Sequence, residues 1–404
     1  MAIGPRNAGG ITRCCVNPLR SIRKPLREAV GFCHAQDVRA DRDMPPADRS
    51  AMDGYALRAA DLNACPCKLR LAGEVAAGSS ARPRVRPGYC ASVLTGANIP
   101  PGSDTVVKIE LTSLHDGIVS ILEPVAPFMN VRKRGEEAAK GDVLLPAGTV
   151  LGPGEVGVCA TVGLSEPKVR RRPRIALLCT GEELRDVSQP VGMHQTRNSN
   201  GPVMQAILAT AGFDSVTHEI VPDDPQLSID ALKRATGEAD VTILTGGVSV
   251  GKYDYVPDAV KAIGAKVRFY KIRMKPGRPL LYATRGRNGH IFGLPGNPVS
   301  VLTSMYAFVL PALRQLAGLS EEKCRISLRL PLTRKIKSKS GRSLMALARV
   351  VNRRSGAAVA PIDSMGSADI SAASGAGGVV VVPAGKSELP AGSIVEFQPW
   401  RADL

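Results

Sequence analysis

A glycine pair at positions 246 and 247 directly follows the short apolar run from Val241 to Leu244. The run predicts a buried strand. A strand that ends on two glycines leads into a loop whose amides can approach an anion closely, because neither glycine carries a Cβ. The segment from Val256 to Ile263 predicts a helix, and the positive end of its dipole would face the same point. We therefore predict that residues 245–254 hold a phosphate group; a tight turn without a ligand is the alternative.

Three carboxylates belong to the same region. Glu183, Asp223 and Asp254 each lie just beyond a run that predicts a strand. Because the carboxyl ends of parallel strands meet at one edge of a sheet, these side chains should gather there. Carboxylates beside a phosphate suit a hard divalent cation, so the sequence predicts a Mg²⁺ site.

Cationic side chains form a second group of candidates. Lys271 and Lys275 are four residues apart, so on an extended chain their ammonium groups share one face and could meet one oxyanion. Arg132 and Arg134 belong to the segment Arg-Lys-Arg-Gly-Glu-Glu, which ends at Glu137 and places three cations beside two acids. This segment could clamp an anion and a metal, and a solvated charged loop is the alternative.

Asp53 stands in a stretch of unusual composition, Ser50–Ala56, which combines small residues with one acid and one aromatic residue. Such a stretch suits a close backbone turn that presents Asp53, rather than a regular packed strand. A purely structural Asx turn is the alternative.

The order of predicted elements explains how these residues could meet. Between residues 173 and 322, runs that predict strands alternate with helical patterns, the last helix covering Val299–Leu316, and this alternation is typical of a parallel, doubly wound sheet. Elsewhere, short apolar runs broken by Gly and Pro predict β units, and a helix is predicted over Leu19–Cys33.

We therefore predict an α/β plus β fold in three parts. Residues 1–172 form an N-terminal linker and β-rich region of two subdomains. This β/α region looks inserted. Residues 173–322 form the doubly wound, Rossmann-like domain. Residues 323–404 form a small C-terminal β-barrel domain.

Composition excludes several classes of protein. The chain has 404 residues and no apolar run near the roughly 18 to 20 residues that span a bilayer, so we expect a soluble protein. Its net charge is +17, but aromatic residues make up only 4%, which argues against base stacking with nucleic acid. A basic field that concentrates small anions and a merely solvated surface both remain open.

Nine scattered cysteines show neither a zinc spacing nor a disulfide framework, and predict reduced thiols and a cytoplasmic location. The basic first 27 residues lack the apolar core of a secretory signal; an organellar transit peptide is the alternative.

Motifs along nearly the whole chain resemble one family. In order, they are Ser50–Ala56, Thr95–Ala97, Gly102–Val107, Arg134–Glu136, Thr180–Leu184, Asn198–Asn200, Asp223–Pro225, Gly246–Gly251, Asp254–Tyr255, Lys275–Pro279 and Gly293–Ser300. In these motifs the chain is similar to the molybdopterin molybdenumtransferases, called MoeA in bacteria and the E domain of gephyrin in animals.

This resemblance implies the last step of molybdenum cofactor synthesis. Molybdate is inserted into the dithiolene of molybdopterin, adenylylated molybdopterin is the substrate, and AMP is released with the help of Mg²⁺. The resemblance also implies an elongated homodimer of four-subdomain chains. Its active site lies between the doubly wound, molybdopterin-binding domain of one chain and the Met-Asp-Gly-Tyr region of the other. A molybdopterin adenylyltransferase is an expected partner, whereas nucleic acid and membrane are not.

The residues and the resemblance together assign roles. The expected contacts of the pterin phosphate are Gly246, Gly247, Ser249 and Gly251. The opposite wall of the pocket would be formed by Pro295, Gly296 and Asn297. The metal would be carried by Glu183, Asp223 and Asp254. Molybdate would be attracted by Lys271, Lys275, Arg132 and Arg134. The site would be completed, from the partner chain, by Asp53 and Thr95. The candidate catalytic residues are thus Glu183, Asp223, Asp254, Asp53 and Lys275.

The chain also departs from the family pattern. Glu137 stands where relatives usually have Asp, and Arg49 stands where they usually have Asn. Residues 370–378 only loosely follow the family's C-terminal motif, so the resemblance assigns no roles there.

Three other functions compete with this interpretation. A molybdopterin adenylyltransferase would need a Gly-Gly-Thr-Gly loop, where this chain has Val248-Ser249 after the glycines, and would lack the flanking β domains. A pure scaffold would have no need of Glu183, Asp223, Asp254 and Lys275 together. A paralogue that inserts tungstate, or one that no longer turns over, stays open because the two oxyanions are nearly alike in size and charge.

Overall fold

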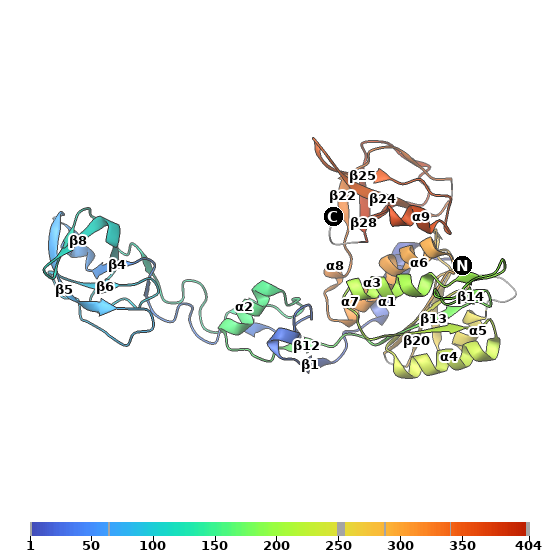
Figure 1. Ribbon diagram of the computed structural model, residues 1–404, viewed down its shortest axis with the longest axis horizontal. Helices are drawn as coiled ribbons and strands as arrows, with labels where there is room; N and C mark the ends of the chain where they lie inside the picture. The colour runs from blue at the N-terminus through green and yellow to red at the C-terminus, as the bar shows by residue number, and fades with distance from the viewer. Residues whose placement is uncertain (1, 64, 249–254, 287, 340, 401–404) are drawn as a thin grey trace. The chain divides into compact units, whose positions relative to one another are not determined.

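The computed structural model describes residues 2–63, 65–248, 255–286, 288–339 and 341–400. The chain divides into two compact units (Figure 1). One comprises residues 1–35, 148–152 and 166–404, and the other comprises residues 36–147 and 153–165. The second unit is thus inserted into the first, as predicted for the N-terminal β/α region. The three-part division at residues 172 and 322 stays a prediction.

The inserted unit is built on a six-stranded sheet of order β7-β4-β6-β5-β9-β8. Its strands are β4 (Gly54–Leu57), β5 (Cys67–Val75), β6 (Tyr89–Val93), β7 (Thr105–Lys108), β8 (Thr112–His115) and β9 (Ile118–Ile121). Two short strand pairs and a helix lie outside this sheet: β2 (Val38–Arg39) pairs with β11 (Val143–Leu145), β3 (Arg49–Ser50) pairs with β10 (Val131–Arg132), and α2 covers Pro153–Thr161. The predicted β-rich region is confirmed.

The larger unit contains a six-stranded sheet of order β16-β13-β17-β21-β20-β18. Its strands are β13 (Ile175–Thr180), β16 (Val216–Val221), β17 (Val241–Thr245), β18 (Lys266–Tyr270), β20 (Leu281–Arg285) and β21 (Gly289–Leu294). The prediction that all strands run parallel is wrong, because β20 is antiparallel to both of its neighbours. Only residues 286–288 join β20 to β21, too few for the crossover that a parallel pair needs.

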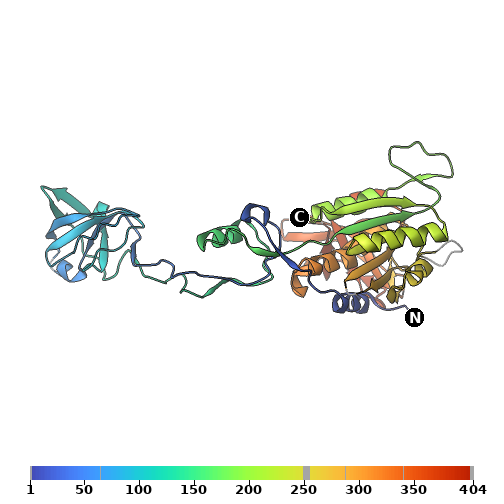
Figure 2. The same ribbon diagram turned by 90° about the horizontal axis from the view of Figure 1, so that it is seen from below.

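Helices cover both faces of this sheet (Figure 2). Alternate residues of β13 point to opposite sides. Leu177 packs into the core formed with α3 (Asn200–Thr210), α6 (Pro298–Ser304) and α7 (Leu310–Leu316). Leu178 packs into the core formed with α4 (Pro225–Glu238) and α5 (Val256–Ala262). The doubly wound domain predicted from βα alternation is therefore confirmed.

The helix predicted over Val299–Leu316 is confirmed as α6 and α7, joined by the π-helical turn η4 (Met305–Val309). Over Pro298–Leu316 this helix is long and apolar enough to cross a membrane, but 72% of its most apolar window is buried inside the structure. It is therefore the core helix of this unit.

The helix predicted over Leu19–Cys33 is wrong. Ser21–Arg23 forms β1, which pairs with β12 (Lys168–Arg170), and a 3₁₀ turn, η1, follows at Leu26–Glu28. Pro25 and the left-handed Gly31 (φ 76°) do not suit a continuous helix here.

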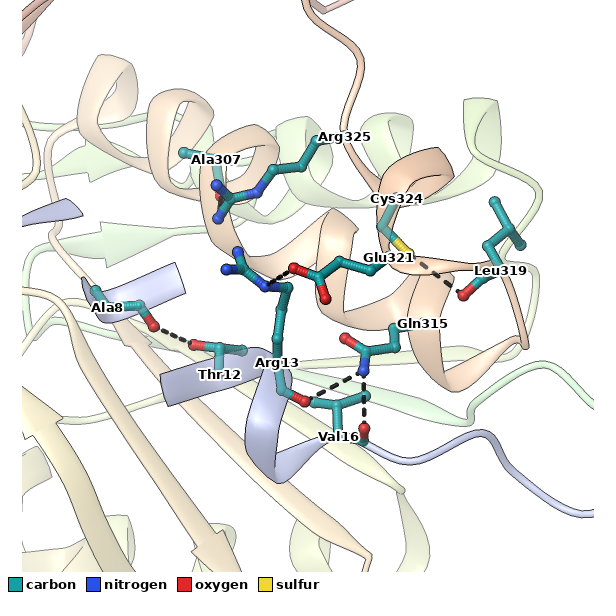
Figure 3. A network of polar contacts seen from close by, with 10 residues as sticks. All are labelled: Ala8, Thr12, Arg13, Val16, Ala307, Gln315, Leu319, Glu321, Cys324 and Arg325. Atoms are coloured by element: carbon teal, nitrogen blue, oxygen red, sulfur yellow. Dashed lines mark hydrogen bonds and ion pairs between the residues drawn. The ribbon is translucent and has the colours of Figure 1, made fainter. Parts of the chain in front are cut away.

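The N-terminal helix is instead α1, which covers Pro5–Cys15. Gln315 Nε2 donates to the carbonyls of Arg13 (3.2 Å) and Val16 (3.0 Å), and so provides hydrogen-bond donors for carbonyl groups at the C-terminal end of α1 (Figure 3). Arg13 also pairs with Glu321 at 2.6 Å.

A C-terminal β domain completes the larger unit. Its main strands are β22 (Leu328–Pro331), β24 (Ser343–Arg353), β25 (Gly356–Pro361), β26 (Gly378–Val382) and β28 (Ile394–Pro399), with a short pair formed by β23 (Ile336–Lys337) and β27 (Glu388–Leu389). Its helix is α9 (Ile370–Ser374). The sheet order is β19-β24-β26-β28-β22, with β25 also on β24, so the edge strand β19 (Met274–Lys275) comes from the doubly wound part of the chain. Leu332 bridges to Val359, which curls the sheet around its own core, as expected for a small barrel-like domain.

Candidate active site

A cavity of about 220 Å³ lies where β13 and β17 end. Its lining includes Thr180, Glu183, Asn200, Asp223, the pair Gly246–Gly247, and Gly296. Of the predicted site residues, the structure therefore brings together two carboxylates, the glycine pair and one residue of the opposite wall. Asp254, Ser249 and Gly251, predicted for the same place, lie outside the described residues.

Gly246 is where the ends of the two strands touch. It has a φ of 91°, and a Cβ on it would lie 2.4 Å from the carbonyl oxygen of Thr180. A side chain would therefore both strain the backbone and collide with the neighbouring strand. Only glycine allows the loop amides to come this close to the cavity.

The two carboxylates converge on the backbone after β13. Glu183 folds back so that its Oε2 lies 2.7 Å from where a Cβ of Gly181 would stand. Asp223 accepts a hydrogen bond from the amide of Glu182 at 3.3 Å. No lysine, arginine or histidine is among the residues described as lining the cavity. The side chains there are neutral or acidic.

The donor set suits a magnesium ion. Within the described ranges, no group of three or more His, Cys, Asp and Glu side chains could hold a metal. Mg²⁺ does not need such a group, because it is usually held by one or two carboxylates together with substrate phosphates and water. Glu183 and Asp223, beside a glycine loop with space for phosphate, meet that requirement.

Asn200, the first residue of α3, ties the loops around the cavity together. Its Nδ2 donates to the carbonyl of Gly296 (2.7 Å) and to Thr245 Oγ1 (3.2 Å). Thr245 Oγ1 in turn donates to the carbonyl of Pro295 (3.0 Å). The motif Asn198-Ser199-Asn200 was recognisable in the sequence. The sequence did not show that Asn200 connects the start of α3 to Thr245 at the end of β17 and to Gly296 in the turn after β21.

A second, larger cleft of about 780 Å³ lies between the doubly wound part and the C-terminal β domain. The predicted residues Lys275, Pro295 and Asn297 line it. Its other cations were not predicted; they are Arg278, Arg334, Lys335, Lys337 and Arg342. The sequence Arg-Lys-Ile-Lys at 334–337 has three cations in four residues, and this local density of charge could have indicated some of the cations of the cleft.

The turn Pro295–Asn297 separates the two hollows. Gly296 lines the acidic cavity, whereas Pro295 and Asn297 line the basic cleft. Asn297 Nδ2 donates to Ser367 Oγ at 2.8 Å, which fastens the turn to the C-terminal domain. One short turn thus has an acidic site on one side and a basic site on the other.

Lys271 is not where an extended chain would place it. Its φ is 68°, in the left-handed region, so the segment from Lys271 to Lys275 is not one strand. The Lys271 ammonium lies 4.8 Å from the ring centroid of Tyr270, and Lys271 is not among the residues that line the basic cleft. The two lysines therefore do not share the one face that their spacing predicted.

The remaining predicted residues belong to the inserted unit. Asp53 Oδ1 accepts hydrogen bonds from the amide (2.6 Å) and hydroxyl (2.8 Å) of Thr95, and these two bonds lower the pKa of the Asp53 carboxyl. The predicted pair Asp53 and Thr95 is therefore in direct contact.

Both predicted arginines of this unit are already paired. Arg132 pairs with Glu136 at 3.0 Å and also contacts Glu137. Arg134 pairs with Asp43 at 2.6 Å. The pKa of Asp43 is lowered, first by the amide of Lys140 and then by Arg134.

Models of three protein regions match successive parts of the chain. The MoeA N-terminal region (domain I and II) matches residues 10–163, a probable molybdopterin binding domain matches residues 176–315, and the MoeA C-terminal region (domain IV) matches residues 329–400. The chain belongs to the MoeA family. It is therefore a transferase of molybdenum cofactor biosynthesis.

Individual relatives agree with the assignment to MoeA. A molybdopterin molybdenumtransferase of Staphylococcus aureus (strain MRSA252) is 32% identical over 93% of this chain and 90% of its own length. One of Nostoc sp. is 37% identical over 73% of this chain and 69% of its own. A crystal structure of the molybdopterin biosynthesis moeA protein from Pyrococcus horikoshii OT3 superposes with a TM-score of 0.85 at 28% identity, covering 99% and 100% of the two chains. The matched N- and C-terminal regions also exclude the adenylyltransferase alternative, which lacks flanking β domains.

Proposed function

We propose that this member of the MoeA family inserts molybdate into molybdopterin, using adenylylated molybdopterin as substrate and releasing AMP in a Mg²⁺-dependent step. The observation that carries the proposal is the position of the turn Pro295–Asn297, which has an acidic cavity on one side and a basic cleft on the other. A reaction that cleaves a phosphoanhydride with release of AMP, and inserts an oxyanion into the same substrate, needs a site for each of these two groups.

The acidic cavity is proposed to hold the phosphoanhydride. The loop amides at Gly246 and Gly247 would donate to phosphate oxygens, as glycine loops at strand ends commonly do. Glu183 and Asp223 would hold Mg²⁺, with Asp254 proposed as a third carboxylate on the basis of the sequence. The chemistry that bound Mg²⁺ supplies is to offset negative charge on the phosphoanhydride oxygens as AMP leaves.

The basic cleft is proposed to hold molybdate. Among the described residues that line it, Lys275 is accompanied by five further cations and one acid, Asp363, which is paired with Arg334 at 2.9 Å. Lysine and arginine donors suit a dianion of the size of sulfate. We propose Lys275 as the residue that orients molybdate toward the molybdopterin end of the substrate. Lys271 would contribute only to the local field.

The inserted unit is proposed to act on a neighbouring protomer. Asp53 and Thr95 are exposed and hydrogen-bonded to each other, so their carboxylate and hydroxyl groups are already positioned and are accessible to another protomer. We propose a cytoplasmic homodimer in which this pair completes the site of the partner chain. Arg132 and Arg134, whose charges are balanced by acids, would support this surface rather than capture molybdate directly.

The test is AMP release from adenylylated molybdopterin by the purified chain, with and without molybdate and Mg²⁺, and with tungstate in parallel. Reconstitution of a molybdenum-free apoenzyme is measured alongside. The proposal expects AMP release that needs both Mg²⁺ and molybdate, and an active reconstituted enzyme. Substrate binding without AMP release would contradict it and favour a scaffold or an inactive paralogue.

A further inference from the structure

The acidic cavity contains two buried polar atoms that the described residues leave without a hydrogen-bond partner. They are Asn200 Oδ1 and Thr180 Oγ1. Leaving a buried polar atom unpaired costs about 1 to 3 kcal/mol, so an atom that the polypeptide leaves unpaired points to a partner such as water or an ion. Both residues line the cavity that Glu183 and Asp223 also line.

The orientation of the Asn200 amide is fixed by its other contacts. Nδ2 donates to the carbonyl of Gly296 at 2.7 Å and to Thr245 Oγ1 at 3.2 Å. A flipped amide would place its oxygen 2.7 Å from that carbonyl, where two acceptors repel each other. The oxygen is therefore the atom left over, and it can only accept.

An atom that only accepts restricts the chemistry of its partner. The oxygens of a phosphate group are themselves acceptors, so phosphate cannot satisfy Asn200 Oδ1. The described lining of this cavity offers two carboxylates, an amide oxygen and a hydroxyl, and no cationic side chain. A hard divalent cation is the partner that such a set of oxygens suits, because Mg²⁺ and Mn²⁺ prefer carboxylate, carbonyl and water oxygens.

We propose that Asn200 Oδ1 is a ligand of the divalent cation held by Glu183 and Asp223, and that Thr180 Oγ1 is a further ligand. Thr180 stands next to Gly181, over which Glu183 folds, so its hydroxyl and that carboxylate belong to the same stretch of chain. Asn200 comes from the start of α3 and lines the same cavity. The cation would thereby link the ends of β13 and β17 to the start of α3. The inference rests on the proposed function only for the task of the cation, not for its binding.

The experiment measures Mn²⁺ binding to the full chain without substrate, by calorimetry and by the electron paramagnetic resonance signal of free Mn²⁺. The wild-type chain should bind Mn²⁺, and Mg²⁺ should compete. Glu183→Gln and Asn200→Ala should each weaken Mn²⁺ binding by about tenfold or more, since even the groups that merely orient metal ligands change affinity 10–100-fold. Thr180→Val, which keeps the shape of the side chain, should weaken it less.

Two further variants separate a ligand from a structural anchor. Asn200→Asp loses the Nδ2 donors, as Asn200→Ala does, and turns its second oxygen toward the Gly296 carbonyl. It keeps a ligand oxygen, however, so it should bind Mn²⁺ more tightly than Asn200→Ala does. Thr245→Val removes the hydroxyl that Asn200 Nδ2 contacts but leaves Asn200 Oδ1 and the bond from Nδ2 to Gly296 in place, so it should weaken Mn²⁺ binding less than Asn200→Ala does. Thermal unfolding of each variant checks that the fold is kept.

Several results would overturn the inference. They are no Mn²⁺ binding by the wild-type chain, unchanged binding by Asn200→Ala, or equal weakening by Asn200→Ala and Asn200→Asp. AMP release is measured separately on the same preparations. Mn²⁺ binding of the expected pattern without AMP release would count against the proposed reaction alone. AMP release with unchanged Mn²⁺ binding by Asn200→Ala would count against this inference alone.

Discussion

Replacing Gly246 by alanine tests the glycine loop most directly. Gly246 has a φ of 91°, and an added Cβ would stand 2.4 Å from the carbonyl oxygen of Thr180 and 2.7 Å from its hydroxyl. Both neighbours belong to the end of β13, which cannot withdraw without moving the sheet. Gly246→Ala should therefore push apart the two strand ends that form the cavity.

The expected loss of stability has two parts. A left-handed backbone costs a residue with a Cβ roughly 1 to 2 kcal/mol. Forcing an extra carbon into a filled space typically costs a further 1 to 3 kcal/mol. The variant should thus lose about 2 to 5 kcal/mol. Gly264→Ala is the matched control, because Gly264 also has a left-handed φ (72°) but has no atom within 4 Å of its added Cβ. It should lose only about 1 to 2 kcal/mol.

Stability is measured by denaturant unfolding, and function by AMP release at a temperature at which both variants remain folded. Gly246→Ala should bind adenylylated molybdopterin much more weakly than the wild type, whereas Gly264→Ala should bind it normally. If the two variants lost equal stability, the close contact at Gly246 would be wrong. If folded Gly246→Ala kept normal substrate affinity, the glycine loop would not hold the phosphate.

Three further predictions concern single side chains. Lys275→Ala should weaken the response of AMP release to molybdate, while Lys266→Ala, on the exposed edge of β18, should not; equal effects would remove Lys275 from the anion site. Burial lowers the pKa of His290 from 6.5 to about 4, so between these values the unfolded chain binds more protons. Stability should therefore fall as pH falls through this window, by about 3 kcal/mol in all, and denaturant unfolding of His290→Phe should lack this part of the pH dependence. Thr95→Val removes one of the two hydrogen bonds to Asp53, so the pKa of that carboxyl should rise in an NMR titration, and an unchanged pKa would show that the amide alone sets it.

The sequence predicted those parts of the fold that depend on local periodicity. Apolar runs of strand length alternating with helical patterns were enough to identify the doubly wound sheet, and glycines and acids after strand ends were enough to place Glu183, Asp223 and Gly246 at one edge. The antiparallel strand β20 was missed because strand direction depends on the length of the connection that follows it, not on apolar pattern.

The N-terminal helix shows how tertiary contacts override local preference. Gly9 and Gly10 make residues 5–15 a poor helix former. In the structure, however, the helix packs against a distant part of the chain. The tip of the Arg325 side chain lies beside Gly9, and its Nη2 would be 2.2 Å from a Cβ added there. The sequence of residues 19–33 had the better helical pattern, but its residues 21–23 pair with β12 instead. Neither contact is visible in a local stretch of sequence.

The same limit explains which site residues were found. Residues that follow a strand can be placed from the sequence, because the sheet fixes where strands end. The basic cleft could not be predicted in this way, since its cations come from the 275–278 segment and from the separate 334–342 segment of the C-terminal domain. Asn200 was missed for a related reason. Its Nδ2 donates to the carbonyl of Gly296, which leaves Oδ1 without a partner, and this division between the two atoms can be seen only once Gly296 is placed beside it.

The net charge of +17 and the local charges around the two hollows should affect anion binding in different ways. A positive field draws anions toward the protein, but salt screens it beyond roughly 10 Å at 0.1 M, so it cannot choose between neighbouring sites. We expect the choice to be made locally, because the acidic lining of the cavity should repel an anion that arrives without a cation, whereas the basic lining of the cleft should attract one directly. Free molybdate should therefore enter the cleft, and a phosphoanhydride should enter the cavity only together with its metal. The turn Pro295–Asn297 would thus keep two anionic substrates in separate places until they react.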